Sequence, residues 1–376
     1  MSYFRSLLSI VAFSLTIQLS TAQDPNLYIF LCFGQSNMEG QGTIGFEDQT
    51  VDERFQVYQA LDCSNLNREK GKWYPAVPPL TRCWTRLSPA DYFGRTMVEN
   101  LPEHIKVGVI NVSVGGCRLE LFDKDIYQNY TNTFSDDWFQ DIIADYEGNP
   151  YQYLLDLAKE AQKDGVIKGI LLHQGESNNG DSQWPTKVKK IYEDLIIDLE
   201  LDATKTPLLA GEMVNADQGG LLAGMNTIIN QLPDVLDNSY VISSSECSDQ
   251  SDNIHFDAAG YRELGRRYAE KMLEVMDYTS TILSELPANV DGIQLHSTYP
   301  NPAKDVTNVS FTLNRPMEIS LNVQDLSGRQ VRIITSKSYD LGSHTIQIDL
   351  SGLESGVYFY SMITDQSIIT RKLIKK

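Results

Sequence analysis

The sequence has few basic residues and, after its first 22 residues, no long apolar run. Its 376 residues include 31 lysines and arginines against 50 aspartates and glutamates, a formal net charge of -19 at pH 7. Because this charge repels polyphosphate, nucleic acid and anionic membranes are not expected as partners. No segment beyond residue 22 is long and apolar enough to cross a bilayer, so no stable membrane span is predicted.

The first 22 residues have the pattern of a secretory signal peptide. Arg5 lies in a short n-region, and the apolar stretch LLSIVAFSLTI that follows is too short to span a bilayer. Ser20 and Ala22 are the small residues expected before a cleavage point, so we expect the mature chain to begin at Gln23. The alternative interpretation of this segment is a membrane anchor.

Cysteine is also scarce, with five residues in the chain. No CxxC pair or His/Cys cluster has the spacing of metal ligands, and no metal site is predicted. Cys63 and Cys83 lie in a polar insert, residues 60–84, where a bridge would close a loop of about 20 residues and contribute about 3 kcal/mol. Export makes disulfides possible, so we expect this pair to be bridged. Cys32, inside an apolar run, is predicted to be a small buried hydrophobic residue.

Between residues 27 and 277, short apolar runs alternate with helical patterns. Strands are predicted at 27–33, 106–113, 167–174, 207–214 and 239–245, and helices near 91–100, 150–163, 185–200, 220–231 and 258–277. This alternation predicts an α/β domain with a parallel sheet covered on both faces. In such sheets, functional sites gather beyond the carboxyl ends of the strands.

From about residue 293 the pattern changes to short alternating segments separated by SG, LGS and SGLESG turns, which predicts a small antiparallel β-sandwich. The predicted organisation is therefore a signal peptide (1–22), an α/β domain (23–280), a linker (281–292) and a C-terminal β-domain (293–376).

Four motifs lie where predicted strands end or a late helix begins. They are GQSN with Ser36, NVSVGG ending at Gly116, LLHQGESN with His173, Gln174, Glu176 and Asn178, and SDNIHF with Asp252 and His255. Taken singly, Ser36 and the glycines fit a tight turn, and Asp252 or Asp257 fits a helix cap.

Taken together, the motifs supply the parts of a hydrolytic site. The spacing of Asp252 and His255 lets the carboxylate hold the imidazole Nδ1–H while Nε2 faces a hydroxyl. Serine is a poor nucleophile unless such a base takes its proton. The oxyanion of the tetrahedral intermediate needs fixed donors, each contributing about 3 kcal/mol.

The motifs GQSNMEG, VGG, HQGESN and DNIHFDAAGYRELGRRYA resemble, in order and spacing, the SGNH hydrolase superfamily over about residues 26–275. The resemblance is to its sialate O-acetylesterase-like and carbohydrate esterase family 6 (acetylxylan esterase-like) branch. It implies a three-layer α/β/α flavodoxin-like fold and no cofactor.

The same resemblance implies a role for each motif residue. Ser36 is the nucleophile, His255 the general base and then acid, and Asp252 its orienting carboxylate. The oxyanion hole consists of the N–H groups of Ser36 and Gly116 and the side chain of Gln174, with Gln35, Asn37 and Glu176 in supporting positions. Glu176 is expected to be structural, hydrogen-bonding the nucleophile loop.

The C-terminal segment resembles a second family. YPNPAKDVTNVSFTL, DLSGRQV, DLSGLESGVYFY and RKLIKK are similar to the type A C-terminal sorting domain of the type IX secretion system. This implies passage through the periplasm, recognition by the secretion machinery, and a secreted or cell-surface location in a Gram-negative bacterium. A carbohydrate-binding or fibronectin type III-like module is the alternative.

The sequence therefore predicts a secreted serine esterase that removes O-acetyl groups from xylan, another polysaccharide or sialic acid. A non-catalytic, surface-displayed glycan-binding protein on the same fold is the first alternative, and a lipase or thioesterase of the same superfamily is the second. Trp73, Trp84, Trp138 and Trp184 are compatible either with a sugar-stacking cleft or with ordinary packing.

Overall fold

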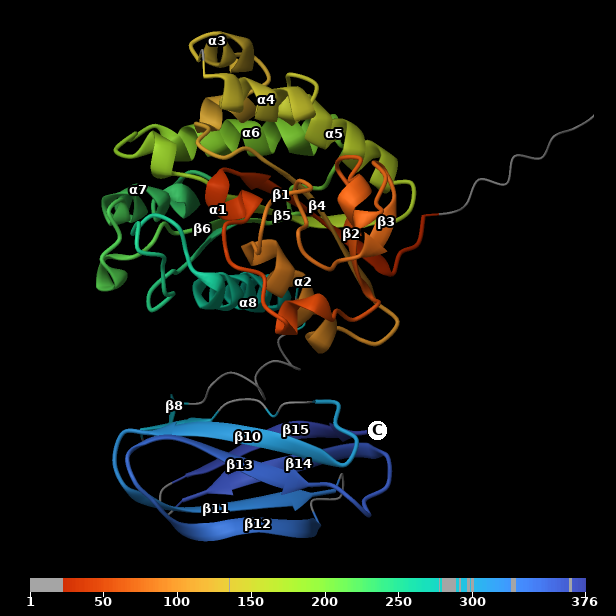
Figure 1. The fold of residues 1–376 in the computed structure, drawn as a ribbon, viewed down its shortest axis with the longest axis vertical. Helices are drawn as coiled ribbons and strands as arrows, with labels where there is room; N and C mark the ends of the chain where they lie inside the picture. The colour runs from red at the N-terminus through yellow and green to blue at the C-terminus, as the bar shows by residue number, and fades with distance from the viewer. Residues whose placement is uncertain are drawn as a thin grey trace, which may run out of the picture.

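Figure 1 shows the fold in a computed structural model, which describes residues 23–134, 136–276, 278, 289–290, 292–295, 298, 301–325, 329–364 and 367–376. The predicted signal peptide, residues 1–22, lies outside the described residues, as does most of the predicted linker 281–292. A two-residue strand, β8 (Asn289–Val290), falls within that linker. Because β8 pairs with β9 (Ile293–Leu295), the strands of the β-domain begin earlier than the predicted residue 293.

The N-terminal domain is built on a seven-stranded sheet with the order β3-β2-β4-β1-β5-β6-β7. The strands are β1 (Leu27–Gly34), β2 (Phe55–Tyr58), β3 (Trp73–Pro75), β4 (Lys106–Ser113), β5 (Val166–His173), β6 (Leu208–Gly211) and β7 (Ser239–Ile242). Neighbouring strands are parallel except β3, which pairs antiparallel with β2 at the edge. The order β4-β1-β5-β6-β7 is flavodoxin-like, and its switch point lies between β1 and β5.

Helices cover both faces of this sheet, as the apolar strands predict (Figure 1). They are α2 (Pro89–Asn100) and α8 (Ala258–Val275) on one face, and α5 (Pro150–Ala161) and α6 (Trp184–Asp198) on the other. Every residue of β1 is buried, and successive side chains alternate between the two faces. Leu31 packs in the core with α5 and α6, whereas Phe30 packs in the core with α2 and α8. The predicted three-layer α/β/α fold is confirmed.

One predicted helix is mostly replaced by shorter turns. Within 220–231, the chain forms only α7 (Asn226–Ile229), preceded by the 3-10 turn Ala223–Met225. The Asn226 side chain is fixed by the backbone of Met213, accepting its N–H at 2.8 Å and donating to its carbonyl at 3.1 Å. A Cβ on Gly220 would lie 2.0 Å from the carbonyl oxygen of Val214, so this segment packs too closely for a regular helix.

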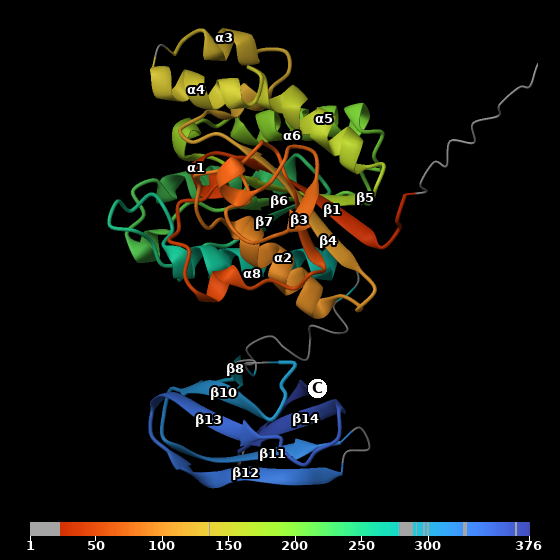
Figure 2. The same ribbon diagram turned by 45° about the vertical axis from the view of Figure 1, so that its right-hand side comes forward.

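Further short elements complete the N-terminal domain. The insert 60–84, predicted as a loop, contains β3 and a 3-10 turn, and a disulfide joins its Cys63 and Cys83. Helix α1 (Ser36–Glu39) follows β1 directly. Helices α3 (Tyr127–Thr131) and α4 (Asp137–Asp145) lie outside the α5–α6 layer in both views (Figures 1 and 2).

The C-terminal domain is an antiparallel β-sandwich of two four-stranded sheets around one core. Their orders are β13-β10-β9-β8 and β12-β11-β14-β15. The remaining strands are β10 (Val306–Leu313), β11 (Met317–Gln324), β12 (Gln330–Tyr339), β13 (Gly342–Asp349), β14 (Gly356–Ile363) and β15 (Ile368–Lys375). Alternate residues of β10 are buried, which is the pattern of a strand with one face in the core. No helix within the described ranges is both long and apolar enough to cross a membrane.

Candidate active site

The switch point of the sheet brings the first and third motifs together. Gly34 ends β1 beside His173, which ends β5, and a Cβ on Gly34 would lie 2.1 Å from the His173 carbonyl oxygen. Only glycine permits this approach, and its φ of +152° belongs to the region that favours glycine. The backbone N–H of Gln35 then donates to the His173 carbonyl at 3.1 Å. Ser36 therefore begins α1 at the carboxyl edge of the sheet.

His255 lies against Ser36, although 219 residues separate them in the sequence. Its Nε2 is 2.8 Å from the Ser36 hydroxyl oxygen, and its Nδ1 is 2.7 Å from Asp252 Oδ2. The other oxygen of Asp252 accepts the backbone N–H groups of Ile254 and His255, each at 3.0 Å. Burial alone would raise the pKa of Asp252, but these hydrogen bonds hold it below its ordinary value. Asp252 is thus ionised at neutral pH and oriented toward the imidazole.

The capping interpretation applies to a neighbouring residue. Asp257 is the N-cap of α8, and its side chain accepts the N–H of Gly260 at 2.8 Å. Capping therefore explains Asp257 and leaves His255 free to face Ser36.

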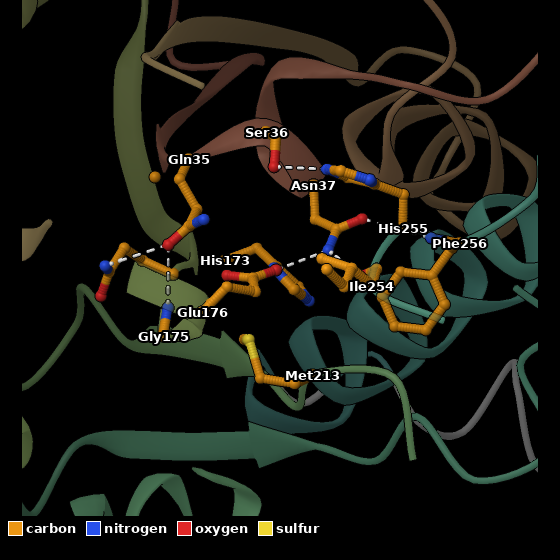
Figure 3. A network of polar contacts seen from close by, with 12 residues as sticks. Gln35, Ser36, Asn37, His173, Gly175, Glu176, Met213, Ile254, His255 and Phe256 are labelled. Carbon is orange, nitrogen blue, oxygen red and sulfur yellow. Dashed lines mark hydrogen bonds and ion pairs between the residues drawn. The ribbon is translucent and has the colours of Figure 1, made fainter. Parts of the chain in front are cut away.

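Asn37 connects the turn after β1, which carries Ser36, to the loop that carries His255 (Figure 3). Its side chain is fully buried, and Nδ2 donates to Glu176 Oε1 at 2.5 Å and to the Ile254 carbonyl at 3.0 Å. Its Oδ1 accepts the Tyr261 hydroxyl at 2.6 Å and the Phe256 N–H at 3.3 Å. Both hydrogens and the oxygen of this amide are used, so Asn37 fixes the segment around His255 relative to α1.

His173 ends β5, and Glu176 lies in the loop that follows it. His173 is fully buried, and its Nε2 is 2.9 Å from the carbonyl oxygen of Glu212. Burial lowers the pKa of His173, which keeps the ring neutral, so this histidine belongs to the core. The expected contact of Glu176 with the nucleophile loop is present, because its carboxylate accepts from Asn37.

Two of the three predicted oxyanion donors are available at this edge. In the described part of the chain, neither the Ser36 N–H nor the Gly116 N–H has a hydrogen-bond acceptor. Ser36 has the first-turn N–H that a helix leaves without an internal partner. Gly116 is exposed, with φ of +74°, in the loop after β4.

The third predicted donor, Gln174, is placed differently. It is fully buried, and its two Nε2 hydrogens are shared among three acceptors: Asn178 Oδ1 at 2.7 Å, Gln35 Oε1 at 3.1 Å and the Cys117 carbonyl at 3.3 Å. Its Oε1 accepts the indole N–H of Trp184 at 2.6 Å. In this arrangement Gln174 ties together the loops that follow β1, β4 and β5, and it would have to release an acceptor to reach an oxyanion.

One buried ion pair beside the site has no counterpart in the sequence prediction. Glu39, at the end of α1, accepts from Arg82 Nη2 at 2.7 Å and from the Gly115 N–H at 3.2 Å. Arg82 precedes Cys83 and also lies 3.5 Å from Asp145 at the end of α4. Only the charge of Glu39 within GQSNMEG hints at such a partner. Among the described residues, no group of three or more His, Cys, Asp or Glu side chains is arranged to hold a metal ion.

Comparison with known proteins agrees with this architecture. Residues 26–274 match the family model described as carbohydrate esterase, sialic acid-specific acetylesterase. The chain belongs to this family. The esterase is a carboxylic ester hydrolase, and its residues 297–376 match a secretion system C-terminal sorting domain, which marks it for secretion or the cell surface.

Two solved structures share the fold of the esterase at low sequence identity. A protein from Arabidopsis thaliana is 19% identical with a TM-score of 0.51, over 67% of this chain and 99% of that chain. The protein NanS is 15% identical with a TM-score of 0.50, over 67% of this chain and 98% of that chain.

Proposed function

We propose that the esterase removes O-acetyl groups from carbohydrate through an acyl-enzyme formed on Ser36. The observation that carries this proposal is the continuous contact from Asp252 through His255 to the Ser36 hydroxyl, at 2.7 and 2.8 Å. His255 Nε2 is within reach of the proton that serine must lose, and Asp252 holds the opposite ring nitrogen.

The reaction then proceeds in two halves. Ser36 Oγ attacks the acetyl carbonyl carbon while its proton passes to His255 Nε2, and the sugar oxygen leaves with that proton as the C–O bond breaks. Water next attacks the acetyl-serine and loses a proton to His255. His255 passes this proton to Ser36 Oγ as the bond between the acyl carbon and Oγ breaks, which leaves free Ser36 and acetic acid that ionises to acetate. Asp252 stabilises the imidazolium in both halves.

The negative oxygen of each tetrahedral intermediate lies between the N–H groups of Ser36 and Gly116 in this proposal. Both are without an acceptor in the described structure, which supports the assignment. We propose that Gln174 is the third donor and that it releases one of its present acceptors when it binds the oxyanion. Gln35 and Asn37 hold the loops around the oxygen.

The first substrate class that we propose is O-acetylated sialic acid, which the family description names. The second is acetylated xylan or another acetylated polysaccharide. We further propose that residues 1–22 direct export into the periplasm of a Gram-negative bacterium and that the C-terminal domain is recognised there by the type IX machinery. Deletion of residues 290–376 is then expected to abolish release to the outside, whereas unchanged release would contradict the sorting role.

The test of the esterase mechanism uses the full chain produced in an oxidising compartment. Acetate release is measured from p-nitrophenyl acetate, acetylated xylan and O-acetylated sialic acid, and we expect Ser36→Ala to lose nearly all of it with an unchanged Tm. Ser64→Ala, an exposed serine in the disulfide-bridged insert, is the matched control and should retain full activity.

Other outcomes separate the alternatives. Substantial residual turnover in Ser36→Ala would contradict the mechanism. Absence of release from a well-folded protein would favour the non-catalytic glycan-binding alternative. A long-chain p-nitrophenyl ester is assayed beside p-nitrophenyl acetate, and preference for the long chain would favour the lipase alternative.

A further inference from the structure

The structure separates the four tryptophans into two kinds. Trp184 is fully buried, and Trp73 is half-buried, with its ring 4.8 Å from that of Tyr58 and its N–H on Asp164. By contrast, Trp84 and Trp138 are exposed by 82% and 55%. A single exposed hydrophobic side chain is ordinary, so exposure alone does not mark a binding site and the position of the residue decides. The question is therefore which exposed indole lies where a substrate passes.

Trp138 lies directly beside the proposed oxyanion loop. A Cβ built on Gly116 would be 3.0 Å from the six-membered ring of the Trp138 indole. The glycine backbone and the edge of the indole are therefore in contact, with space for no larger side chain between them. A sugar whose acetyl carbonyl oxygen reaches the Gly116 N–H has Trp138 as its immediate neighbour.

The indole is held in place by a packed helix. Its neighbour on α4, Phe139, is buried, and their ring centroids are 5.5 Å apart. Phe139 in turn packs against Phe134 at 4.7 Å, and Asp145 at the end of α4 lies 3.5 Å from Arg82. Trp138 is therefore an exposed side chain on a fixed base, which lowers the entropy lost when a ligand covers it.

A hollow in the surface is lined by residues that follow Gly116 in the sequence and by residues that precede Trp138. This hollow has a volume of about 480 Å³ and is lined by Arg118, Glu120, Tyr130 and Phe134 among others. Arg118 is two residues from Gly116, and its backbone N–H donates to the Tyr130 hydroxyl at 2.8 Å. Its own side chain is exposed. A volume of this size is in the range that holds a small ligand.

We propose that Trp138 is the sugar-binding platform of the esterase, with the indole face covering the pyranose ring that carries the scissile acetyl group. This inference rests on the proposed function, because it assigns the substrate of the same site. A pyranose ring presents apolar C–H groups on its faces and hydroxyl groups around its rim. A flat, rigid indole complements that face, while the rim stays in water or reaches the hollow beside Arg118.

The experiment measures kcat/KM on two substrates. One is the glycan ester that the wild-type full chain hydrolyses best, and the other is p-nitrophenyl acetate, which has no sugar ring. For Trp138→Ala we expect the loss on the glycan to exceed the loss on p-nitrophenyl acetate by about tenfold. Trp138→Phe, which keeps a ring, should lose little of the kcat/KM for the glycan. Trp138→Leu, which keeps only apolar bulk, should lose as much as the alanine variant.

The matched control is Phe46→Ala. Phe46 is 93% exposed and precedes the turn Glu47–Gln49, whose Asp48 pairs with Arg262 of α8 rather than with α4. This variant should leave both activities unchanged. Equal losses on both substrates in Trp138→Ala, or equal behaviour of the leucine and phenylalanine variants, would overturn the proposal.

Binding measured without turnover separates this inference from the proposed function. In the Ser36→Ala background, calorimetry with the acetylated glycan should give a Kd about tenfold weaker when Trp138→Ala is added. If hydrolysis proves independent of Ser36 while this weakening remains, the proposed mechanism fails and the platform stands. If hydrolysis depends on Ser36 and Kd is unchanged, the platform is refuted.

Discussion

Replacing Asn37 by aspartate exchanges the amide nitrogen for an oxygen at the contact between the turn after β1 and Glu176. In the native protein Asn37 Nδ2 donates to Glu176 Oε1 at 2.5 Å, and both side chains are buried. Asn37→Asp places a second carboxylate oxygen there. Two carboxylates at this separation do not both ionise, so one keeps a proton and its pKa rises above the value in the unfolded chain.

The sign and size of the effect follow from that shift. A carboxyl whose pKa is raised by folding destabilises the fold as pH rises above the unfolded value, and the penalty is complete above the folded value. A rise of about three units from an unfolded pKa of about 4 costs about 1.5 kcal/mol at pH 5 and about 4 kcal/mol at pH 8. For a domain of this size, the expected fall in Tm is about 3–6 °C at pH 5 and about 8–16 °C at pH 8.

Tryptophan fluorescence is the appropriate assay, because all four tryptophans lie between residues 73 and 184 of the N-terminal domain. Asn179→Asp, an exposed change with the same net charge, should shift Tm little at either pH. Adding Glu176→Gln to Asn37→Asp restores a donor and an acceptor to the contact and should recover the pH-dependent part of the loss at pH 8. The part due to the lost donation to the Ile254 carbonyl remains. Equal losses at pH 5 and pH 8, or no recovery in the double variant, would refute the reasoning.

Two further predictions concern other parts of the same domain. Joint replacement of Cys63 and Cys83 by serine opens a loop with a sequence separation of 20. It should lower the free energy of unfolding by about 3 kcal/mol and Tm by about 6–12 °C. Reductant should produce the same fall in the wild type, and no change in Tm on reduction would contradict the prediction. Burial raises the pKa of Asp91 to about 7, so its ionisation opposes folding increasingly as pH rises from about 4 to about 7. Asp91→Asn, which can still accept the Ser88 N–H, should therefore gain in Tm relative to the wild type between pH 5 and pH 8, and a constant difference would contradict this.

The sheet and the Asp252–His255 pair were predictable because each rests on a local pattern. Apolar runs gave β1, β4 and β5 nearly to their ends, and polar residues directly after those runs pointed to one edge of the sheet. Asp252 and His255 are close in sequence, so their contact is a property of a single turn. The helix predicted at 220–231 is confined to Asn226–Ile229, where the side chain of Asn226 is bound to the backbone of Met213, a contact that periodicity does not encode.

The contacts between loops could not be predicted in this way. The amide of Gln174 is bound to the carbonyl of Cys117, 57 residues earlier, and Glu39 is paired with Arg82, 43 residues later. Neither pair shares an element or a repeating spacing. The exposure of Trp138 depends likewise on how α4 packs, which only the folded chain shows.

The proposed nucleophile and its proposed base touch in the fold but lie near opposite ends of the sequence of the N-terminal domain, at positions 36 and 255. A chain emerging from the ribosome has the serine within its first tenth but lacks the imidazole until two-thirds of its length is made. In the proposed mechanism this serine does not react before then, because serine is a poor nucleophile without a base to take its proton. The contact between Ser36 and His255 forms only when the segment before α8 docks against the turn after β1, so, in the proposed mechanism, recovery of esterase activity on refolding reports the formation of this long-range contact.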